Sequence, residues 1–508
     1  MSSTSSRVIK NTTYLYIKTI VSMLVMLYAT RIVLQSLGVV DYGIYNVVAG
    51  SIAILGFFRN SLAVTMQRFL NHYQGAGNIE KQRQVFNIGI IYHWAIALLL
   101  LLLFLILGFF LFNGILNIPE ERNVAAKIVY ACLIVNTFLT VVTAPYDATI
   151  TAHENMLFYS LVGITESLMK LIVAIAIVYV KGDKLVIYAI MMMGIPLLET
   201  LSMRIYCKLK YEECSFHPKR NFNLPLAKQM ITFASWSLLG STTNMISCHG
   251  ANLALNHFFG AAINAVAGIA NQIQGLLAVV FTNLMKSLTP VIFKTEGAGN
   301  AKNMLEYSLA GCKYSTLLFA FLAIPVFIQT PYLLKIWLVD VPEWTVLFVR
   351  LQLVRALIEQ LGASLQTSLN ASNNIKEINL LSVFYNLAPL IILVILYGLG
   401  FQPYWHFVIM ISVMVMGQNA IMIYFCHKYC GLRYEDYGRK VLLPMLVVTI
   451  VSYFCGIIPT YFAEGFLQFV SCSLFSTTIS AILAYKMMED HERKRIVGAL
   501  HLLHFANN

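Results

Sequence analysis

Apolar runs of about twenty residues or more recur along the whole chain, separated by short polar breaks. A run of that length lets an α-helix cross a hydrocarbon core of about 30 Å. We therefore predict an all-α polytopic membrane protein with fourteen membrane-spanning helices, at residues 11–37, 42–73, 85–112, 123–150, 156–180, 185–209, 226–257, 262–293, 303–330, 344–371, 377–400, 403–427, 440–461 and 465–487.

The longest polar breaks divide these helices into blocks of six, six and two. We predict an N-terminal lobe at 1–210, a linker at 211–225 and a C-terminal lobe at 226–430. A second linker at 431–440 leads to two extra helices and a tail at 441–508. Prolines inside the predicted helices, such as Pro145 and Pro290, are candidate hinges because each removes a backbone hydrogen bond.

Composition agrees with this interpretation. Hydrophobic residues make up 58% of the 508 and charged residues 11%, whereas soluble domains carry about 25% charged residues. The nine cysteines form no CxxC pair and have no histidine cluster beside them, so the sequence encodes neither a local zinc site nor a redox motif. We expect the first apolar run to stay in the mature chain, because it includes Lys18 and Arg31 and lacks a small-residue cleavage pattern.

The placement of charge predicts the orientation. With the N-terminus inside, twenty Lys and Arg residues fall in loops on one side and four on the other, and cytoplasmic loops are rich in these residues. We expect both termini in the cytoplasm of a multi-pass protein of the bacterial inner membrane. The net charge of +12 is then mainly a topology signal, and no soluble basic domain is present to bind nucleic acid.

An internal repeat links residues 37–78 to residues 259–300. The two stretches align without gaps at an offset of 222, and seven of the 42 positions are identical, including Gly38 with Gly260 and the GAGN sequences at 75–78 and 297–300. A second echo, TAHEN at 151–155 and NASNN at 370–374, follows the fourth helix of each block. Six helices separate the copies, so the halves share one orientation, as in a parallel repeat around a central cavity.

These motifs resemble a known family. The element LG-x-x-DYGIYN at Leu37–Asn46, the GAGN sequences and the layout of six, six and two helices look like the bacterial O-antigen and capsule flippases. These belong to the multidrug/oligosaccharidyl-lipid/polysaccharide (MOP) flippase superfamily, which has a MATE-like fold. The resemblance, to about residue 490, implies alternating access and transport of an undecaprenyl-diphosphate-linked sugar unit. It also implies that the last two helices shape a groove for the lipid tail.

Eleven basic residues lie inside the predicted helices, against four acids at comparable depth, Asp147, Glu166, Glu199 and Glu359. Charges at such depth are costly and mark function or pairing. Glu166 with Lys170, and Arg355 with Glu359, have the i, i+4 spacing of a structural ion pair. Lys127, Arg204 and Arg350, and with them Lys18 and Arg68, lie close enough to helix ends to reach the interface.

The remaining cations are candidate ligands for a diphosphate. Arg31, Arg59, Lys286 and Lys313 have no acid nearby in sequence, and Arg355 joins them if it does not pair; the alternative is an acid from another helix. Arg59 and Lys286 lie in corresponding helices, and we expect both at the central cavity. Candidate sugar contacts, which could equally be interhelical hydrogen bonds, are Trp236, Asn244, Asn271 and Gln272. Candidate groups for ion coupling are Asp147, Glu166 and Glu359.

The leading hypothesis is a flippase for a lipid-linked oligosaccharide, such as an O-antigen or capsule repeat unit. The alternatives are a flippase for the peptidoglycan precursor, a multidrug cation antiporter, and a membrane glycan polymerase or ligase. The antiporter is disfavoured because it would need acids in excess, and the enzymes because no large loop carries paired carboxylates or metal ligands. We expect a non-enzyme without cofactor, driven by a proton or sodium gradient or by the membrane potential. Its expected partners are the lipid-linked oligosaccharide, membrane lipids and polysaccharide polymerase or export proteins.

Overall fold

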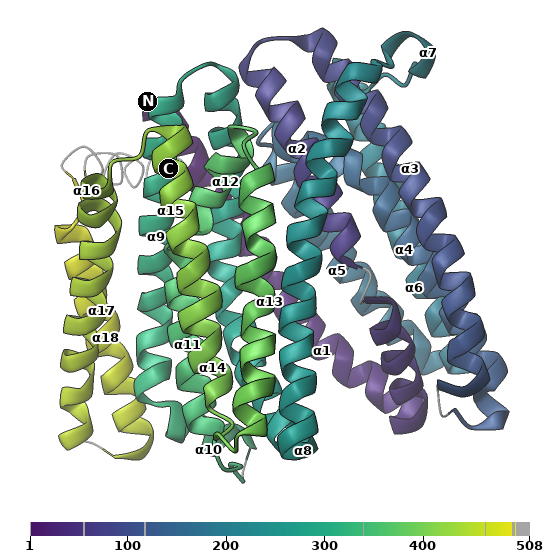
Figure 1. Cartoon of the computed structure of the whole chain (residues 1–508). Coiled ribbons are helices and arrows are strands. Elements are labelled where there is room, and N and C mark those ends of the chain that lie inside the picture. Colours follow the sequence, from purple (N-terminus) through teal and green to yellow (C-terminus); the bar gives the residue numbers. More distant parts are fainter. Residues whose placement is uncertain are drawn as a thin grey trace, which may run out of the picture. The chain divides into compact units, whose positions relative to one another are not determined.

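A computed structural model of the chain describes residues 2–53, 56–115, 118–338, 340–462, 464–489 and 493 (Figure 1). None of these residues lies in a β-strand, which confirms the predicted all-α class. The helices are α1 (Ser2–Ala53), α2 (Gly56–Gly75), α3 (Ile79–Phe110), α4 (Asn123–Ala152), α5 (Met156–Tyr179), α6 (Lys184–Lys210), α7 (Pro218–Asn221), α8 (Leu224–Gly297), α9 (Ala301–Ile328), α10 (Thr330–Leu338), α11 (Thr345–Gln360), α12 (Ala363–Ala371), α13 (Lys376–Gly398), α14 (Trp405–Ile409), α15 (Met416–Cys430), α16 (Tyr434–Tyr437), α17 (Leu443–Ile457) and α18 (Gly465–Lys486).

The chain divides into two compact units. The first-half unit is Asn11–Leu238, and the second-half unit is Leu239–Asn508 together with Met1–Lys10. The division falls inside α8, so the first turns of that helix belong to the first-half unit.

Within the described residues, eleven helices are long and apolar enough to cross a membrane, which makes this a multi-pass membrane protein. Three features account for the difference from the fourteen predicted helices. Two predicted spans are joined in the 74-residue α8. The predicted span at 42–73 is divided between the end of α1 and α2, and the span at 344–371 between α11 and α12.

Two glycines at the repeat offset interrupt the longest helices. Gly38 in α1 has φ 78° and ψ 169°, and Gly260 in α8 has φ 81° and ψ 177°. This backbone region is open almost only to glycine. No atom lies within 4 Å of an added Cβ at either position, so conformation rather than space requires the glycine. The two repeats therefore bend at the same place in the same way.

The two GAGN sequences form one type of turn. In the first turn, the backbone N–H groups of Ala76, Gly77 and Asn78 donate to the carbonyls of His72, Gln74 and Tyr73, respectively. The same three bonds recur 222 residues later in the second turn. There, Ala298, Gly299 and Asn300 donate to Lys294, Glu296 and Thr295. Both glycines have positive φ. The Asn78 and Asn300 side chains then cap the next helix. We call this end of each unit the GAGN end and the opposite end the Gly38 or Gly260 end.

The TAHEN and NASNN turns also match in backbone geometry. Glu154 has φ 55° and Asn373 has φ 66°, at the offset of 219 that the sequence predicts. His153 and Ser372, which precede them, donate their backbone N–H to Thr149 and Ser368. A positive φ is uncommon outside glycine, so its occurrence in both copies supports the repeat.

The fourth helix of each half differs. α4 continues through Pro145, and Thr149 Oγ1 donates to the Pro145 carbonyl at 2.9 Å. The corresponding helix of the second half ends at Gln360 and resumes at Ala363, although no proline lies there. The break therefore occurs where the sequence contains Gly362, and not where the first half contains its proline.

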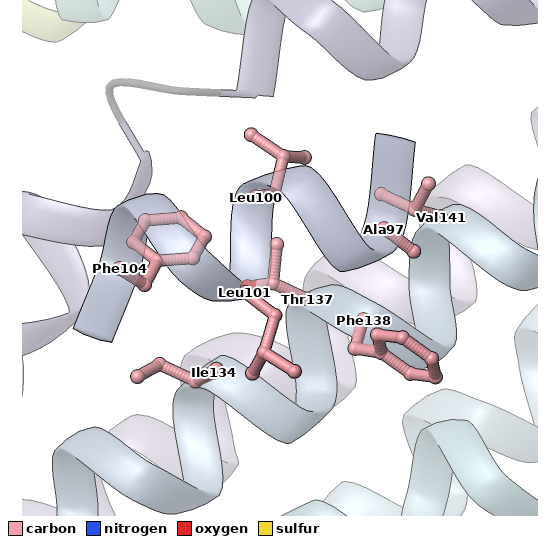
Figure 2. Close-up of a pocket in the computed structure, with 8 residues that line it drawn as sticks. All are labelled: Ala97, Leu100, Leu101, Phe104, Ile134, Thr137, Phe138 and Val141. Atoms are coloured by element: carbon pink, nitrogen blue, oxygen red, sulfur yellow. The ribbon is translucent and has the colours of Figure 1, made fainter. Parts of the chain in front are cut away.

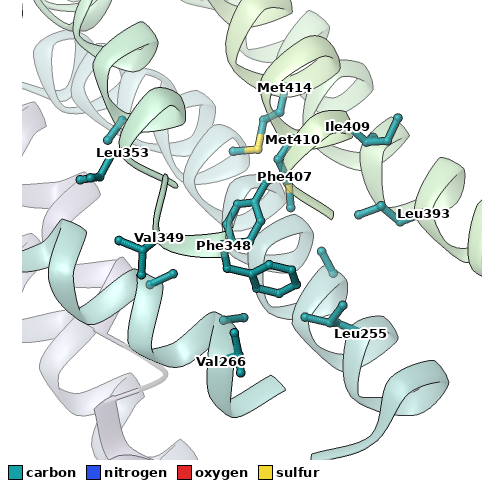
Figure 3. Close-up of a cluster of buried hydrophobic side chains, with 14 of the residues drawn as sticks. Leu255, Val266, Phe348, Val349, Leu353, Leu393, Phe407, Ile409, Met410 and Met414 are labelled. Carbon is teal, nitrogen blue, oxygen red and sulfur yellow. The ribbon is translucent and has the colours of Figure 1, made fainter. Parts of the chain in front are cut away.

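Buried side chains from α8, α11, α13 and α14 form a core at the Gly260 end of the second-half unit (Figure 3). Leu255 and Val266, on either side of Gly260, share this core with Phe348 and Phe407, whose rings meet edge to face at 5.0 Å. The two arms of α8 approach closely because the residues between them are small: Ala251, Ala254, Ala267 and Ala270. This core sets the start of α11 beside the Gly260 bend.

Candidate functional site

A chain of polar side chains links the two arms of α8 to α11 in the second-half unit, with Gln352 buried and Asn244 and Asn271 exposed. Asn271, on the second arm of α8, accepts a hydrogen bond from Gln352 Nε2 of α11 at 2.9 Å. One turn along α11, Arg355 Nη1 donates to Gln352 Oε1 at 3.5 Å. On the first arm of α8, Cys248 interacts with Arg355, and its thiol lies 4.0 Å from Asn244 Oδ1. We call Asn244, Cys248, Asn271, Gln352 and Arg355 the Arg355 cluster.

The Arg355 cluster lies about halfway through the membrane. At 1.5 Å per residue, Arg355 lies about 15 Å beyond the start of α11, Cys248 about 18 Å before Gly260 and Asn271 about 16 Å after it. A hydrocarbon core is about 30 Å thick. The bend at Gly260 thus brings both arms of α8 to the same depth as the arginine.

Arg355 retains unused hydrogen-bonding capacity. Both Arg355 and Glu359 are among the described residues, and no ion pair joins them despite their i, i+4 spacing. Glu359 is exposed, and Arg355 turns towards Gln352 instead. The buried Arg355 Nε has no hydrogen-bond partner among the described groups. A guanidinium with a long bond to Gln352, a contact with Cys248 and a buried Nε–H that has no described partner can still bind an anion.

The other cations of this unit are placed differently. Lys286 on α8 is half-buried, and Lys313 on α9 is buried with its ammonium 5.7 Å from the Tyr314 ring centre. Both engage other groups of the protein. Arg350 donates to the Phe327 carbonyl at 3.1 Å, which ties it to the end of α9.

In the first-half unit, Arg31 is exposed on α1 and Asp147 is half-buried on α4. The side chain of Arg59 lies outside the described residues, so its predicted role is not tested. Lys170 Nζ donates to Glu166 Oε1 at 2.6 Å, the pairing that the spacing predicts. Lys18 and Arg68 lie against aromatic rings, with Lys18 4.5 Å from the Tyr159 centroid and Arg68 4.4 Å from that of Phe69.

Of the candidate sugar contacts, the structure brings Asn244 and Asn271 together with Arg355. Gln272 is exposed next to Asn271, and Trp236 belongs to the first-half unit, where it is half-buried. Gln352 and Cys248 were not among the residues predicted for the site. The i, i+3 spacing of Gln352 and Arg355 on one helix face was the available signal for the glutamine.

Two other kinds of site have little support in the described part of the chain. No group of three or more His, Cys, Asp or Glu residues there could hold a metal ion. A narrow crevice lies between α3 and α4 (Figure 2). Its lining is apolar except for Thr137, whose hydroxyl donates to the Leu133 carbonyl. It offers nothing to a charged substrate.

No protein-family model matches the sequence, and no curated protein does. Solved structures match the fold. A multidrug resistance MATE family transporter of the MOP superfamily, in an outward-facing conformation, is 14% identical with a TM-score of 0.71, and the match covers 83% of this chain and 96% of that chain. A MATE in the straight conformation is 16% identical with a TM-score of 0.68, covering 83% and 94%.

A third similar structure is a MOP superfamily transporter from Pyrococcus furiosus, described as having a binding pocket of reverse polarity that suggests a different function. It is 15% identical with a TM-score of 0.68, and the match covers 85% of this chain and 96% of that chain. Similarity at this level of identity establishes architecture. The chain therefore has the fold of the MATE transporters of the MOP superfamily.

Proposed function

We propose that this protein moves an undecaprenyl-diphosphate-linked oligosaccharide, a repeat unit of a surface polysaccharide, across the bacterial inner membrane by alternating access. The observation that carries the proposal is Arg355, a cation at mid-membrane depth that forms no ion pair with any described acid and donates to the amide of Gln352, which in turn bonds Asn271. A diphosphate that crosses hydrocarbon needs fixed donors to replace its hydration.

The chemistry of the Arg355 cluster suits both parts of such a substrate. The planar guanidinium can bind two phosphate oxygens at once. Asn244, Asn271 and Gln352 offer the amide donors and acceptors that sugar hydroxyls use. A carrier of cationic drugs would instead need acids in excess at this depth, whereas Arg355 and Glu359 are present there in equal number.

A gradient of protons or sodium, or the membrane potential, would drive the cycle. Of the three candidate coupling acids, Glu359 is exposed and Glu166 forms an exposed ion pair with Lys170, whereas Asp147 is half-buried and engages other groups of the protein; we favour Asp147 for its burial. Partner polymerase or export proteins would act on the product after it has crossed.

Mass spectrometry of lipid-linked intermediates in a deletion strain tests the substrate class. We expect prenyl-diphosphate-linked repeat units to accumulate on the cytoplasmic side and surface glycan to be lost. Accumulation of the peptidoglycan precursor would identify the other flippase branch. Unchanged lipid intermediates with altered drug sensitivity would favour a multidrug exporter.

Site variants in the same strain test the cations. Arg355→Gln, and separately Arg59→Gln with Lys286→Gln, should lower surface glycan at least about tenfold with protein level unchanged, because a charge-assisted bond to an anion contributes about 1.5 to 3 kcal/mol. The matched control is Arg204→Gln, since Arg204 is exposed near the end of α6. Normal glycan in both site variants would refute the proposed phosphate ligands.

A further inference from the structure

The linker between the two halves is fastened to α3 of the first-half unit. Asn87 Nδ2 donates to the Ser215 carbonyl at 2.9 Å, and the backbone N–H of His217 donates to Asn87 Oδ1 at 2.8 Å. Arg83 forms an ion pair with Glu212 at 3.1 Å. These bonds give the short helix α7 and its flanks a defined position beside α3, as the packing at the GAGN end shows (Figure 1).

The fastened linker exposes apolar and basic side chains together. Phe216 is 52% exposed, Phe222 44% and Leu224 56%. Lys219 and Arg220 between them are also exposed, and no described carboxylate pairs with either. Aromatic side chains beside unpaired cations are typical of a segment that lies in a membrane interface.

The depth of the linker supports this location. Asn87 lies eight residues after the start of α3, so about 12 Å of the helix projects beyond it, and about 35 Å separates Asn87 from Phe110 at the other end. That length slightly exceeds a hydrocarbon core of about 30 Å. The bonds to Asn87 therefore hold residues 215–217 near the headgroup boundary and not in bulk water.

We propose that residues 215–224 dock on anionic phospholipid headgroups, with Phe216 and Phe222 inserted at the acyl boundary and Lys219 and Arg220 bound to headgroup phosphates. The second linker provides an internal contrast. Its short helix α16 also exposes an aromatic residue, Tyr434, but Arg433 beside it pairs with Glu435 at 3.1 Å and Asp436 follows. Residues 215–224 contain no acid beside Lys219 and Arg220, whereas α16 carries Glu435 and Asp436, and this local basic charge favours an anionic leaflet over other partners.

Tryptophan quenching in nanodiscs tests the proposal. The reporter is Phe222→Trp, compared with the parent protein to subtract its five native tryptophans. Discs contain phosphatidylcholine with either brominated phosphatidylglycerol or brominated phosphatidylcholine at the same fraction. We expect the added tryptophan to be quenched several-fold more by the anionic lipid, since each basic residue near such a surface favours binding about fivefold. Adding Lys219→Gln and Arg220→Gln should remove the preference and leave quenching by phosphatidylcholine.

The matched control is Tyr434→Trp in the second linker, for which we expect no preference between the two lipids. Phe216→Trp serves as a second reporter if Phe222→Trp does not fold, as judged by size-exclusion chromatography. Equal quenching with and without the two cations, or quenching by neither lipid, would overturn the proposal, and the second result would favour a protein partner. Loss of the preference in inorganic phosphate at unchanged ionic strength would show that the cations select free phosphate over a headgroup.

Discussion

The Gly38 end of the first-half unit and the Gly260 end of the second-half unit share a backbone plan but differ in chemistry. Arg122 precedes α4 and Trp344 precedes α11, at the repeat offset of 222. Arg122 pairs with Asp41 and, at 2.8 Å, with Asp183. Trp344 instead stacks on Tyr404, with ring centres 5.9 Å apart and planes 29° apart. The backbone also differs at this position, since Arg122 has φ −102° and Trp344 has φ 70°. The bends at Gly38 and Gly260 therefore match, while the turn before the fourth helix has changed in conformation and its contacts have changed from ionic to aromatic.

The GAGN ends diverge in the same way. In the first half, His153 Nε2 donates to Glu213 Oε1 at 2.5 Å, and Nδ1 accepts from Gln74 Nε2 at 3.1 Å. The ring also stacks on Tyr211, at 3.9 Å between centres. The equivalent position in the second half is Ser372, whose hydroxyl donates to the Leu369 carbonyl at 3.0 Å. The first half thus depends on charged and titratable groups at both ends.

The largest expected effect comes from the His153 network. His153→Ala leaves Glu213, which is 3% exposed, buried without its partner, at a cost of about 3 kcal/mol. Ser372→Ala should cost about 1 kcal/mol or less. Midpoints of thermal unfolding in detergent, followed by size-exclusion chromatography, measure both. Equal losses of stability in the two variants would contradict the inference that different interactions stabilise the two GAGN ends.

A smaller effect should be common to both halves. Gly38→Ala and Gly260→Ala each force a side chain into a glycine-only backbone region, at a cost of about 1 to 3 kcal/mol. The same unfolding assay should show similar losses for the two. Gly43→Ala and Gly268→Ala are matched controls, because both glycines are helical and open and should be neutral or stabilising. A large difference between Gly38→Ala and Gly260→Ala would mean that the bends are not equivalent.

The effect of salt on stability should distinguish the ion pairs of Arg122 at the Gly38 end from the aromatic contact of Trp344 at the Gly260 end. Arg122→Gln should cost about 1 kcal/mol at low ionic strength and less in 1 M salt, because the three side chains are partly exposed and screened. Trp344→Leu should cost about as much, independently of salt. The measurement is the unfolding midpoint of each variant across a salt series. A salt-independent loss in Arg122→Gln would contradict the ionic interpretation.

The smallest expected effect is the pH dependence of Asp183. Burial alone would raise the pKa of this carboxyl. The hydrogen bonds from Arg122 and from the Val186 and Leu185 backbone N–H groups outweigh that effect, so the pKa lies below its usual range. A depressed folded pKa contributes stability above about pH 4 that is lost as the pH falls through the folded pKa. Asp183→Asn should therefore reduce the acid-induced fall in the unfolding midpoint between pH 5 and pH 3. If Asp183→Asn leaves the pH dependence of the unfolding midpoint unchanged, other carboxyls cause the loss of stability in acid.

The sequence was informative wherever a local rule applied. The GAGN turns could be predicted because their backbone demands small residues, and Glu166 with Lys170 could be predicted because helix geometry makes them neighbours. The same rule failed for Arg355 and Glu359. There, Arg355 donates instead to Gln352 on the same helix face, and Gln352 bonds Asn271 on the second arm of α8.

By itself, the sequence determined the all-α membrane class and the offset of the repeat, including the pairing of Gly38 with Gly260, since these follow from apolar length and from identities at a fixed spacing. The structure showed that the chain bends at both glycines. Only the tertiary structure decided which charges meet. Asp41 lies 81 residues from Arg122, and Asn271 lies 81 from Gln352. Contacts at that separation depend on how helices pack, and packing is set by the shapes of many side chains together, which no local pattern records.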